Sequence, residues 1–346
     1  MADLRDVPLS VLDLAPVSKG SSSAEALRNS VDLAQHAERL GFHRYWVAEH
    51  HNMPGIASSS PAVLIGHIAG ATTSIRVGSG GVMLANHTPL VVAEQFGMLE
   101  AFHPGRIDLG IGRAPGTDQV TASALRRTSD ISADDFPQDL GEVMAFFDGS
   151  FPNGHLYARI SAVPARGNVP AMWLLGSSGY SAQLAAYLGL PFAFAHHFSP
   201  DNTLPALALY RAGFRPSATL SKPYAMVAAA VVCADSDDRA RWLALPGALS
   251  FLRLRAGYPD LLPSPEEAAA YPYTELERQA MQSRQVHQII GDPETVQRGL
   301  TDLLEQTSAD ELMLTTIVHD HADRVRSYAL VAAMTSPRQE RYSAVR

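Results

Sequence analysis

The segment Glu49-His50-His51 places an acidic residue and two histidines directly after a short apolar run. An unperturbed imidazole has a pKa of about 6.5, so a histidine can donate, accept or shuttle a proton near neutral pH. Because neighbouring side chains on a strand point to opposite sides, only one of these histidines can easily face a site at the strand's end. The segment indicates either one catalytic histidine or an ordinary polar strand end.

Two further histidine groups, His196-His197 and His319-Asp320-His321, also follow apolar runs. They leave a metal site assembled across several strands as an alternative. The spacing argues against it, because the chain has no His-Glu-x-x-His motif and adjacent strand histidines do not converge on one ion. The single cysteine, Cys233, excludes an internal disulfide and a cysteine-based metal cluster. We therefore expect no metal, and a buried Cys233.

Small residues interrupt two other apolar runs. In Gly78-Ser79-Gly80-Gly81, glycines within an expected strand indicate close approach of a flat ligand, an unusual backbone geometry or a tight barrel corner. In Ile111-Gly112-Arg113, an arginine follows the run among small residues, where its guanidinium can meet a phosphate. Surface arginines are common, so this second segment is a weak signal by itself.

The segment Gly176-Ser177-Ser178-Gly179-Tyr180-Ser181 joins an apolar run to an amphipathic stretch. Free backbone N–H groups and the positive end of a helix make such a turn an anion site, to which serine hydroxyls add donors. The segment is neither a Walker loop nor a Gly-x-Gly-x-x-Gly dinucleotide turn. An ordinary N-capped helix after a flexible turn is the alternative.

Elements that position these residues follow from the alternation of apolar runs with amphipathic stretches. Continuous apolar runs are typical of parallel strands covered on both faces, and the helices between them imply βαβ units. The number of runs favours a closed (β/α)8 TIM barrel, an α/β fold with its active site at the C-terminal strand ends, over an open doubly wound sheet. The predicted strands are Leu9–Leu14, Tyr45–Ala48, Arg76–Leu84, Ile107–Ile111, Ala171–Leu175, Phe192–Ala195, Tyr224–Cys233 and Leu312–Ile317.

No linker divides the chain, so we expect a single domain over residues 1–346. Two long insertions, at about 114–132 and 249–286, would follow C-terminal strand ends. The second contains many prolines and tyrosines, and we interpret it as a lid or a wall of the substrate pocket.

The charge balance argues against some functions. Asp and Glu number 35 against 27 Lys and Arg, for a net charge of −8, whereas nucleic-acid binding needs clustered basic residues. No apolar run reaches the roughly 20 residues that span a bilayer. The first residues do not form a basic segment followed by an apolar one, so we expect no secretory signal and a cytoplasmic protein.

Taken together, these segments resemble the bacterial-luciferase-like flavin-dependent monooxygenases in order and spacing. The opening segment Leu12–Pro16 is similar to a subgroup that includes enzymes of streptomycete polyketide pathways. The similar segments are Glu49-His50-His51, Val77–Leu84, His87–Gln95, Pro104–Arg113, Gly176-Ser177-Ser178, Gly189-Leu190-Pro191 and, more weakly, Ile290–Val296.

The resemblance implies an enzyme that binds FMN, as FMNH2 from a separate flavin reductase, with O2 as co-substrate. It also implies a homodimer and a small-molecule substrate, with no role for nucleic acid or membrane. The apolar second insertion favours a hydrophobic or aromatic substrate, such as a polyketide in antibiotic biosynthesis.

The resemblance also assigns residues. His50 matches the family's catalytic histidine, and Gly80 and Gly81 match a strand pair joined by a non-prolyl cis peptide beneath the flavin ring. Gly112 falls where the family often has a small residue near that ring. Luciferases carry an acidic residue where Ser177 stands, which leaves the ribityl contacts open. The phosphate-binding positions match Arg113, Gly176, Ser177, Ser178, Gly179, Tyr180 and Ser181.

Two other functions fit the same fold. An F420-dependent dehydrogenase would transfer hydride on the same barrel without oxygen. A non-catalytic flavin-binding subunit would bind the cofactor for a partner.

Overall fold

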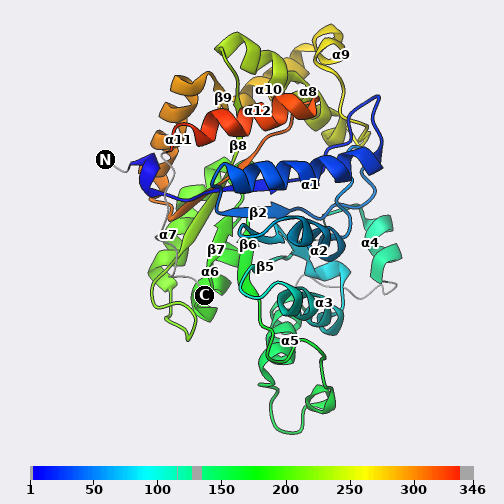
Figure 1. Ribbon diagram of the computed structural model, residues 1–346, viewed down its shortest axis with the longest axis vertical. Coiled ribbons are helices and arrows are strands. Elements are labelled where there is room, and N and C mark those ends of the chain that lie inside the picture. Colours follow the sequence, from blue (N-terminus) through cyan, green and yellow to red (C-terminus); the bar gives the residue numbers. More distant parts are fainter. Residues whose placement is uncertain (1–2, 115, 127–134, 336–346) are drawn as a thin grey trace.

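The structure is a computed structural model that describes residues 3–114, 116–126 and 135–335. Its strands form one parallel sheet, and its helices surround that sheet (Figure 1). The strands are β1 (Leu9–Asp13), β2 (Arg44–Val47), β3 (Arg76–Ser79), β4 (Val82–Met83), β5 (Ile107–Gly112), β6 (Ala171–Gly176), β7 (Phe192–Phe194), β8 (Ala225–Cys233), β9 (Ile289–Gly291) and β10 (Glu311–Thr315). The α-helices are α1 (Ser23–Arg39), α2 (Pro61–Ala71), α3 (Pro89–Phe102), α4 (Gln119–Arg126), α5 (Phe136–Asp148), α6 (Gly179–Leu188), α7 (Thr203–Gly213), α8 (Asp237–Arg255), α9 (Pro265–Ala270), α10 (Glu275–Gln285), α11 (Pro293–Thr307) and α12 (His321–Ala332).

Pairing between β8 and β10 closes the sheet. Neighbours follow the order β10, β1, β2, β3, β5, β6, β7 and β8, and Leu312 of β10 pairs with both Leu9 of β1 and Val227 of β8. The predicted (β/α)8 barrel is therefore confirmed, and the doubly wound alternative is wrong.

Two details differ from the sequence prediction. The expected strand Arg76–Leu84 is divided into β3 and β4 around Gly80 and Gly81, because the chain leaves the ladder there. The short strand β9 was not predicted. It pairs with the end of β8 beyond the barrel, at Val231 and Ile289. Its sequence, Ile-Ile-Gly, is too short to give a strand signal of its own.

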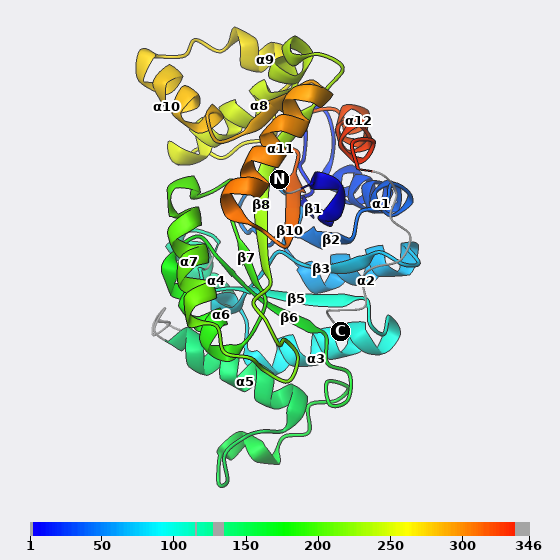
Figure 2. The same ribbon diagram turned by 90° about the vertical axis from the view of Figure 1, so that its left-hand side faces the viewer.

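Helices α8, α9 and α10 gather at one end of the molecule, and the segment after α5 extends at the opposite end (Figures 1 and 2). The predicted insertion 249–286 therefore consists of the last part of α8, all of α9 and α10, and the loops between them. The predicted insertion 114–132 contains α4, and its last residues lie outside the described part of the chain.

Charged residues fill the barrel at the N-terminal ends of its strands. The Arg44 guanidinium, which is 1% exposed, lies 2.9 Å from Asp108 Oδ2 and 3.1 Å from Glu311 Oε1, and both carboxylates are fully buried. Burial alone would lower the pKa of Arg44, but attraction to Asp108 and Glu311 raises it overall. Arg76 and the Tyr224 hydroxyl complete the network at 2.6 Å from Asp108 and 2.9 Å from Glu311.

An apolar layer separates this charged network from the C-terminal half of the barrel interior. The Trp46 and Trp173 rings meet edge to face, with centroids 5.2 Å apart. Leu12, Met226 and Met313 pack in the same cluster. Because these side chains close the barrel from below, a ligand can enter only from the C-terminal strand ends.

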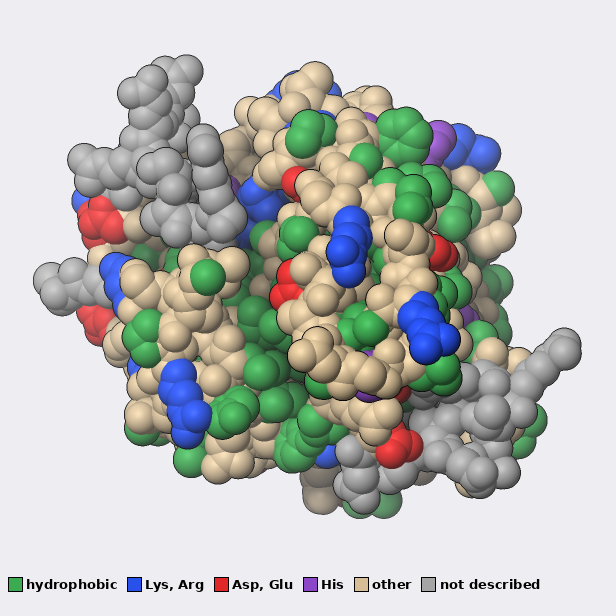
Figure 3. All heavy atoms as spheres, turned by 90° about the horizontal axis from the view of Figure 1, so that it is seen from below, with side chains coloured by type: hydrophobic (Ala, Val, Ile, Leu, Met, Phe, Trp, Pro, Cys, Tyr) green, Lys and Arg blue, Asp and Glu red, His purple; other side chains and the backbone are tan. Residues whose placement is uncertain are grey.

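Lysine and arginine side chains are scattered over the face shown in Figure 3 and do not form a continuous basic patch there. None of the helices within the described ranges combines the length and the hydropathy needed to cross a membrane.

Candidate active site

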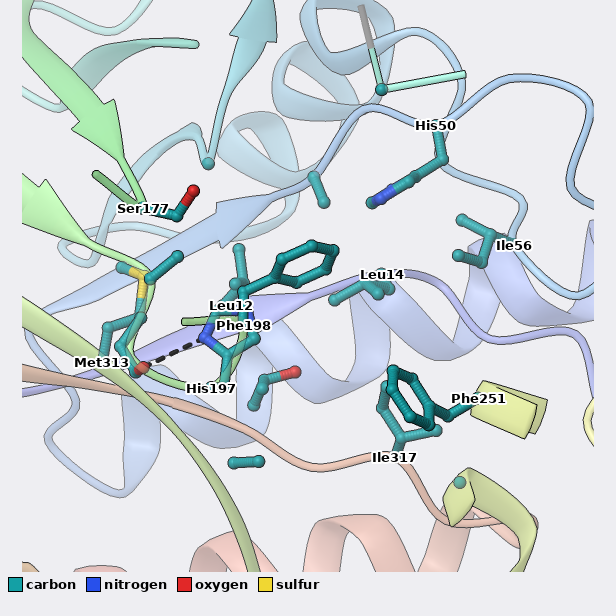
Figure 4. Close-up of a pocket in the computed structure, with 18 of the residues that line it drawn as sticks. Leu12, Leu14, His50, Ile56, Ser177, His197, Phe198, Phe251, Met313 and Ile317 are labelled. Carbon is teal, nitrogen blue, oxygen red and sulfur yellow. Dashed lines mark hydrogen bonds between the residues drawn. The ribbon is translucent and has the colours of Figure 1, made fainter. Parts of the chain in front are cut away.

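A cavity of about 450 Å³ lies at the C-terminal strand ends (Figure 4). Its size is within the range of small-molecule and cofactor sites. Every barrel strand, or the turn that follows it, contributes to the lining. Among the predicted site residues, those that line the cavity are His50, Gly80, Gly112, Arg113, Gly176, Ser177, Ser178 and Ser181.

His50 enters the cavity from the turn after β2. Its backbone N–H donates to the carbonyl of Ser58 at 3.0 Å, and its imidazole points into the cavity (Figure 4). The Nδ1 atom is buried and has no hydrogen-bond partner in the described structure. Burial is the main reason why the pKa of His50 falls to about 4. The ring is therefore neutral at pH 7 and has one nitrogen free to bond a ligand.

Glu49, which the sequence analysis did not assign, organises the structure around this turn. Its carboxylate is fully buried, and Oε1 lies 2.9 Å from both His51 Nε2 and His87 Nε2. Oε2 accepts from the Met83 backbone N–H at 3.0 Å, and Asn86 donates to Oε1 at 3.1 Å. Burial raises the pKa of Glu49, but the hydrogen bond and charge of His87 lower it overall.

These bonds join the end of β2 to β4 and to the 3₁₀ turn Leu84–Asn86. The two histidines of the first motif therefore point to different places: His51 binds Glu49, and His50 faces the cavity. The acidic residue before His50 was the available signal, since a carboxylate at the end of a buried strand needs partners.

The Gly80–Gly81 peptide bond is cis. A Cβ atom at Gly80 would lie 2.7 Å from Leu12 Cδ1, and one at Gly81 would lie 2.9 Å from the Gly110 carbonyl oxygen. At Gly112 it would lie 3.0 Å from Met83 Sδ. Gly80 and Gly112 therefore line the cavity with backbone alone, and Gly81 is not among the lining residues.

The serine turn lies where β6 leads into α6. Ser178 is the N-cap of α6, and its side chain makes no capping bond, so the first-turn N–H groups keep their capacity for a ligand. Ser177, Ser178 and Ser181 all line the cavity. A Cβ at Gly176 would lie 2.7 Å from Ser181 Cβ, so this turn needs glycine there.

Arg113 lies over the ring of Tyr180, with Cζ 4.3 Å from the ring centroid. Arg113 lines the cavity, whereas Tyr180 and Gly179 do not. The ring of Tyr180 lies against the Arg113 guanidinium, and its contact with a cofactor stays a prediction. Because Tyr180 belongs to the first turn of α6, the contact holds Arg113 near the serine turn.

His197 also lines the cavity and was not assigned from the sequence. Its Nδ1 lies 3.0 Å from the Ala228 carbonyl oxygen, the dashed contact in Figure 4, so Nδ1 carries the proton and Nε2 is the acceptor of the neutral ring. Burial lowers the pKa of His197. His196 turns away and contacts Thr203 Oγ1 at 2.9 Å. Within the described ranges, no group of three His, Cys, Asp or Glu side chains is arranged to hold a metal ion.

Both predicted insertions contribute to the cavity wall. Ala114 and Gly116 come from the first. From the second, Pro259 lines the cavity, whereas Tyr258, Tyr271 and Tyr273 do not. The lining residues of α8 and α10 are Gly247, Ser250, Phe251, Leu254 and Arg284, together with Ala244.

Comparison with known proteins gives the family context. The model of the luciferase-like monooxygenase family matches residues 7–311. A luciferase-like monooxygenase of Escherichia coli (strain K12) is 49% identical over 326 residues, covering 94% of this chain and 96% of that protein. The N-acetyl-S-alkylcysteine monooxygenase of Bacillus subtilis (strain 168) is 34% identical over 328 residues, covering 94% of this chain and 97% of that protein.

Solved structures are similar over the same length. Apo-MsnO8 has a TM-score of 0.87 at 39% identity, covering 96% of this chain and all of that one. The oxygenating constituent of 3,6-diketocamphane monooxygenase from Pseudomonas putida, in complex with FMN, has a TM-score of 0.69 at 18% identity, covering 96% of this chain and 98% of that one. An F420-dependent secondary alcohol dehydrogenase has a TM-score of 0.69 at 14% identity, covering 96% of this chain and all of that one. The last two show a shared fold only.

Proposed function

The chain belongs to the luciferase-like monooxygenase family, and we propose that it is the oxygenating component of a two-component system. In this proposal it binds FMNH2 supplied by a separate flavin reductase and uses O2 to oxygenate a small hydrophobic or aromatic molecule. The observation that carries the proposal is that the unpaired His50 Nδ1, Arg113 and the serine turn face one cavity.

The residues of the cavity fit FMN at both of its ends. Arg113, the serine hydroxyls and the first-turn N–H groups of α6 would hold the phosphate, because each donates hydrogen bonds or positive charge. The bare wall at Gly80 and Gly112 would accommodate the flat ring. When bound, the reduced flavin supplies the electrons that activate O2.

His50 would hold or move a proton at Nδ1. Its ring is neutral at pH 7, so Nδ1 can accept a hydrogen bond, or donate one in the other tautomer, without first losing a charge. Leu12, Leu14 and Phe251, among other apolar lining residues, would exclude water from the reacting atoms. The Bacillus relative named for N-acetyl-S-alkylcysteine makes thioethers a class to include in a substrate screen.

An anaerobic titration of the purified chain with FMNH2, followed by flavin fluorescence, tests cofactor binding. Turnover is then tested with a general flavin reductase, NADH and a panel of aromatic, apolar and thioether compounds under ¹⁸O₂. We expect saturable binding and one ¹⁸O atom in the product. Absence of any FMNH2-dependent change would contradict the proposal.

The same panel separates the alternative functions. Substrate oxidation under argon with F420 would assign the site to hydride transfer. Product formation by the purified chain with a flavin reductase excludes a non-catalytic subunit.

A further inference from the structure

Three lining residues of the cavity carry a buried polar atom with no hydrogen-bond partner in the described structure. These atoms are His50 Nδ1, Ser250 Oγ and Arg284 Nε. His50 belongs to the proposed catalytic machinery, but Ser250 and Arg284 lie on α8 and α10 and have no role there. Buried polar groups normally have partners, so two orphans in one cavity wall indicate a ligand that supplies them.

Arg284 lies near the end of α10, with its Cζ 3.9 Å from the centroid of the Phe251 ring. Within the described ranges it forms no ion pair, and burial lowers its pKa to about 10, which leaves it charged at pH 7. The lining carboxylate Asp260 does not neutralise it, because Asp260 contacts Lys19 and Arg253, each at 3.5 Å.

Two fully buried arginines of this chain, Arg44 and Arg324, show that a guanidinium removed from solvent is paired here with carboxylates. Arg44 is 1% exposed and contacts Asp108 and Glu311, and Arg324 is 3% exposed and lies 3.0 Å from Asp13. A buried charge without a partner is unfavourable, and an aromatic face compensates for only part of that cost. Arg284 is half-buried, but its Nε is buried without a partner, and the residue lines the cavity.

Ser250 directly precedes Phe251 on α8, and the Phe251 ring is the one that Arg284 contacts. Ser250 therefore belongs to the same part of the cavity wall as Arg284. A helical serine commonly bonds a backbone carbonyl one turn earlier, as Ser30 does with Ala26 at 3.2 Å. Ser250 makes no such bond. Its hydroxyl is available as a second donor to an anion held by Arg284.

We propose that Arg284 and Ser250 form a carboxylate-binding subsite, so that the substrate is an apolar molecule with one carboxylate group. The inference rests on the proposed function and identifies its substrate class. A carboxylate suits the subsite because one guanidinium and one hydroxyl match a single negative charge and its lone pairs. In Figure 4, Phe251 and Ser177 lie on opposite sides of the cavity, so this subsite is separate from the proposed phosphate turn.

Binding to the flavin-free chain tests the subsite by calorimetry. The probes are octanoate, decanoate and dodecanoate, each compared with its neutral primary amide. We expect at least one carboxylate to bind about 10-fold or more tightly than its amide, from the strength of a charged hydrogen bond. Equal affinity for acid and amide throughout the series overturns the proposal.

Variants assign the preference to residues. Arg284→Gln should remove the preference for the acid and leave amide binding unchanged, and Ser250→Ala should reduce it by about 2- to 10-fold. The matched control is Arg255→Gln, because Arg255 also lies over Phe251, at 5.7 Å, but is exposed and does not line the cavity. If Arg255→Gln loses the preference for the acid as fully as Arg284→Gln does, the assignment of the subsite to Arg284 is overturned.

Stability separates a binding role from a structural one. Removal of a half-buried charge that has no ion-pair partner should leave the melting temperature of Arg284→Gln unchanged or higher. Because these measurements use no flavin, a chain that fails to bind FMNH2 but prefers carboxylates contradicts the proposed function alone. A chain that oxygenates substrates but shows no acid preference contradicts the subsite alone.

Discussion

The guanidinium carbon of Arg113 lies 4.3 Å from the centroid of the Tyr180 ring. Arg113 directly follows β5, and Tyr180 belongs to the first turn of α6. The contact therefore places the positive charge of Arg113 beside the serine turn that follows β6. It holds Arg113 beside the turn that we propose to bind the cofactor phosphate.

Replacing Arg113 with Ala should weaken FMNH2 affinity about 10-fold or more, because a charge-assisted bond of roughly 1.5–3 kcal/mol is lost. Tyr180→Leu should have a smaller effect, about 2- to 5-fold, since it removes only a cation–π contact of about 0.5–1 kcal/mol. Anaerobic fluorescence titration measures both. Arg215→Ala is the control, because Arg215 stacks on Tyr187 at 4.4 Å away from the cavity. Unchanged affinity in the Arg113 variant would remove it from the site.

His50 should make the protein less stable as the pH falls below neutral. Its folded-state pKa of about 4 lies below the unfolded value of about 6.5, so the unfolded chain binds the proton more readily. The contribution of the neutral ring is fully present above pH 6.5 and is lost as the pH falls from about 6.5 to about 4. His196 and His197 act in the same direction, so wild-type curves alone do not isolate His50.

The difference between wild type and His50→Asn isolates this residue. Urea unfolding at several values between pH 7.5 and pH 4.5 should show a smaller loss of stability in the variant, by about 1–3 kcal/mol over that interval. Parallel curves for the two proteins would show that His50 does not titrate in this way.

Replacing Glu49 with Gln should lower the free energy of unfolding by about 1–3 kcal/mol. The amide keeps one acceptor oxygen and has an NH2 donor in place of the other, so at least one of the donors from Met83, Asn86, His51 and His87 loses its acceptor. The turn that carries His50 should also shift, which lowers kcat. Glu142→Gln, on the exposed face of α5, is the control and should be neutral. Equal stability of the two variants would show that the hydrogen bonds of Glu49 do not stabilise this part of the fold.

Gly110→Ala should destabilise the barrel, because its Cβ would overlap the Ser79 carbonyl oxygen and lie 2.9 Å from Leu175 Cδ1. Overpacking of a core by one carbon typically costs about 1–3 kcal/mol. Gly70→Ala, within α2, meets no atom within 4 Å and should stabilise by about 0.5–1 kcal/mol. Thermal unfolding of both variants measures the contrast. A harmless Gly110 variant would show that β3 and β5 can move apart.

Local sequence patterns favoured the barrel, and together with the family resemblance they predicted much of the cavity lining. Continuous apolar runs such as Ala225–Cys233 indicate a covered parallel strand without any long-range information. In such a barrel, the residues just after each run share one rim, so the strand-end positions of His50, Arg113 and Ser177 already predicted that they would meet.

Tertiary structure alone decided which polar groups have partners. Ser10 bonds Glu311 across 301 positions, Glu49 bonds His87 across 38, and Arg284 rests on Phe251 without a carboxylate. No local pattern encodes such pairings, because a polar residue in an apolar stretch has the same signal whether its partner is present or missing. The free energy of a charged side chain depends on the atoms that the folded barrel brings close to it. The sequence therefore does not reveal that Arg44 has carboxylate partners while Arg284 Nε has none, and only the tertiary structure does.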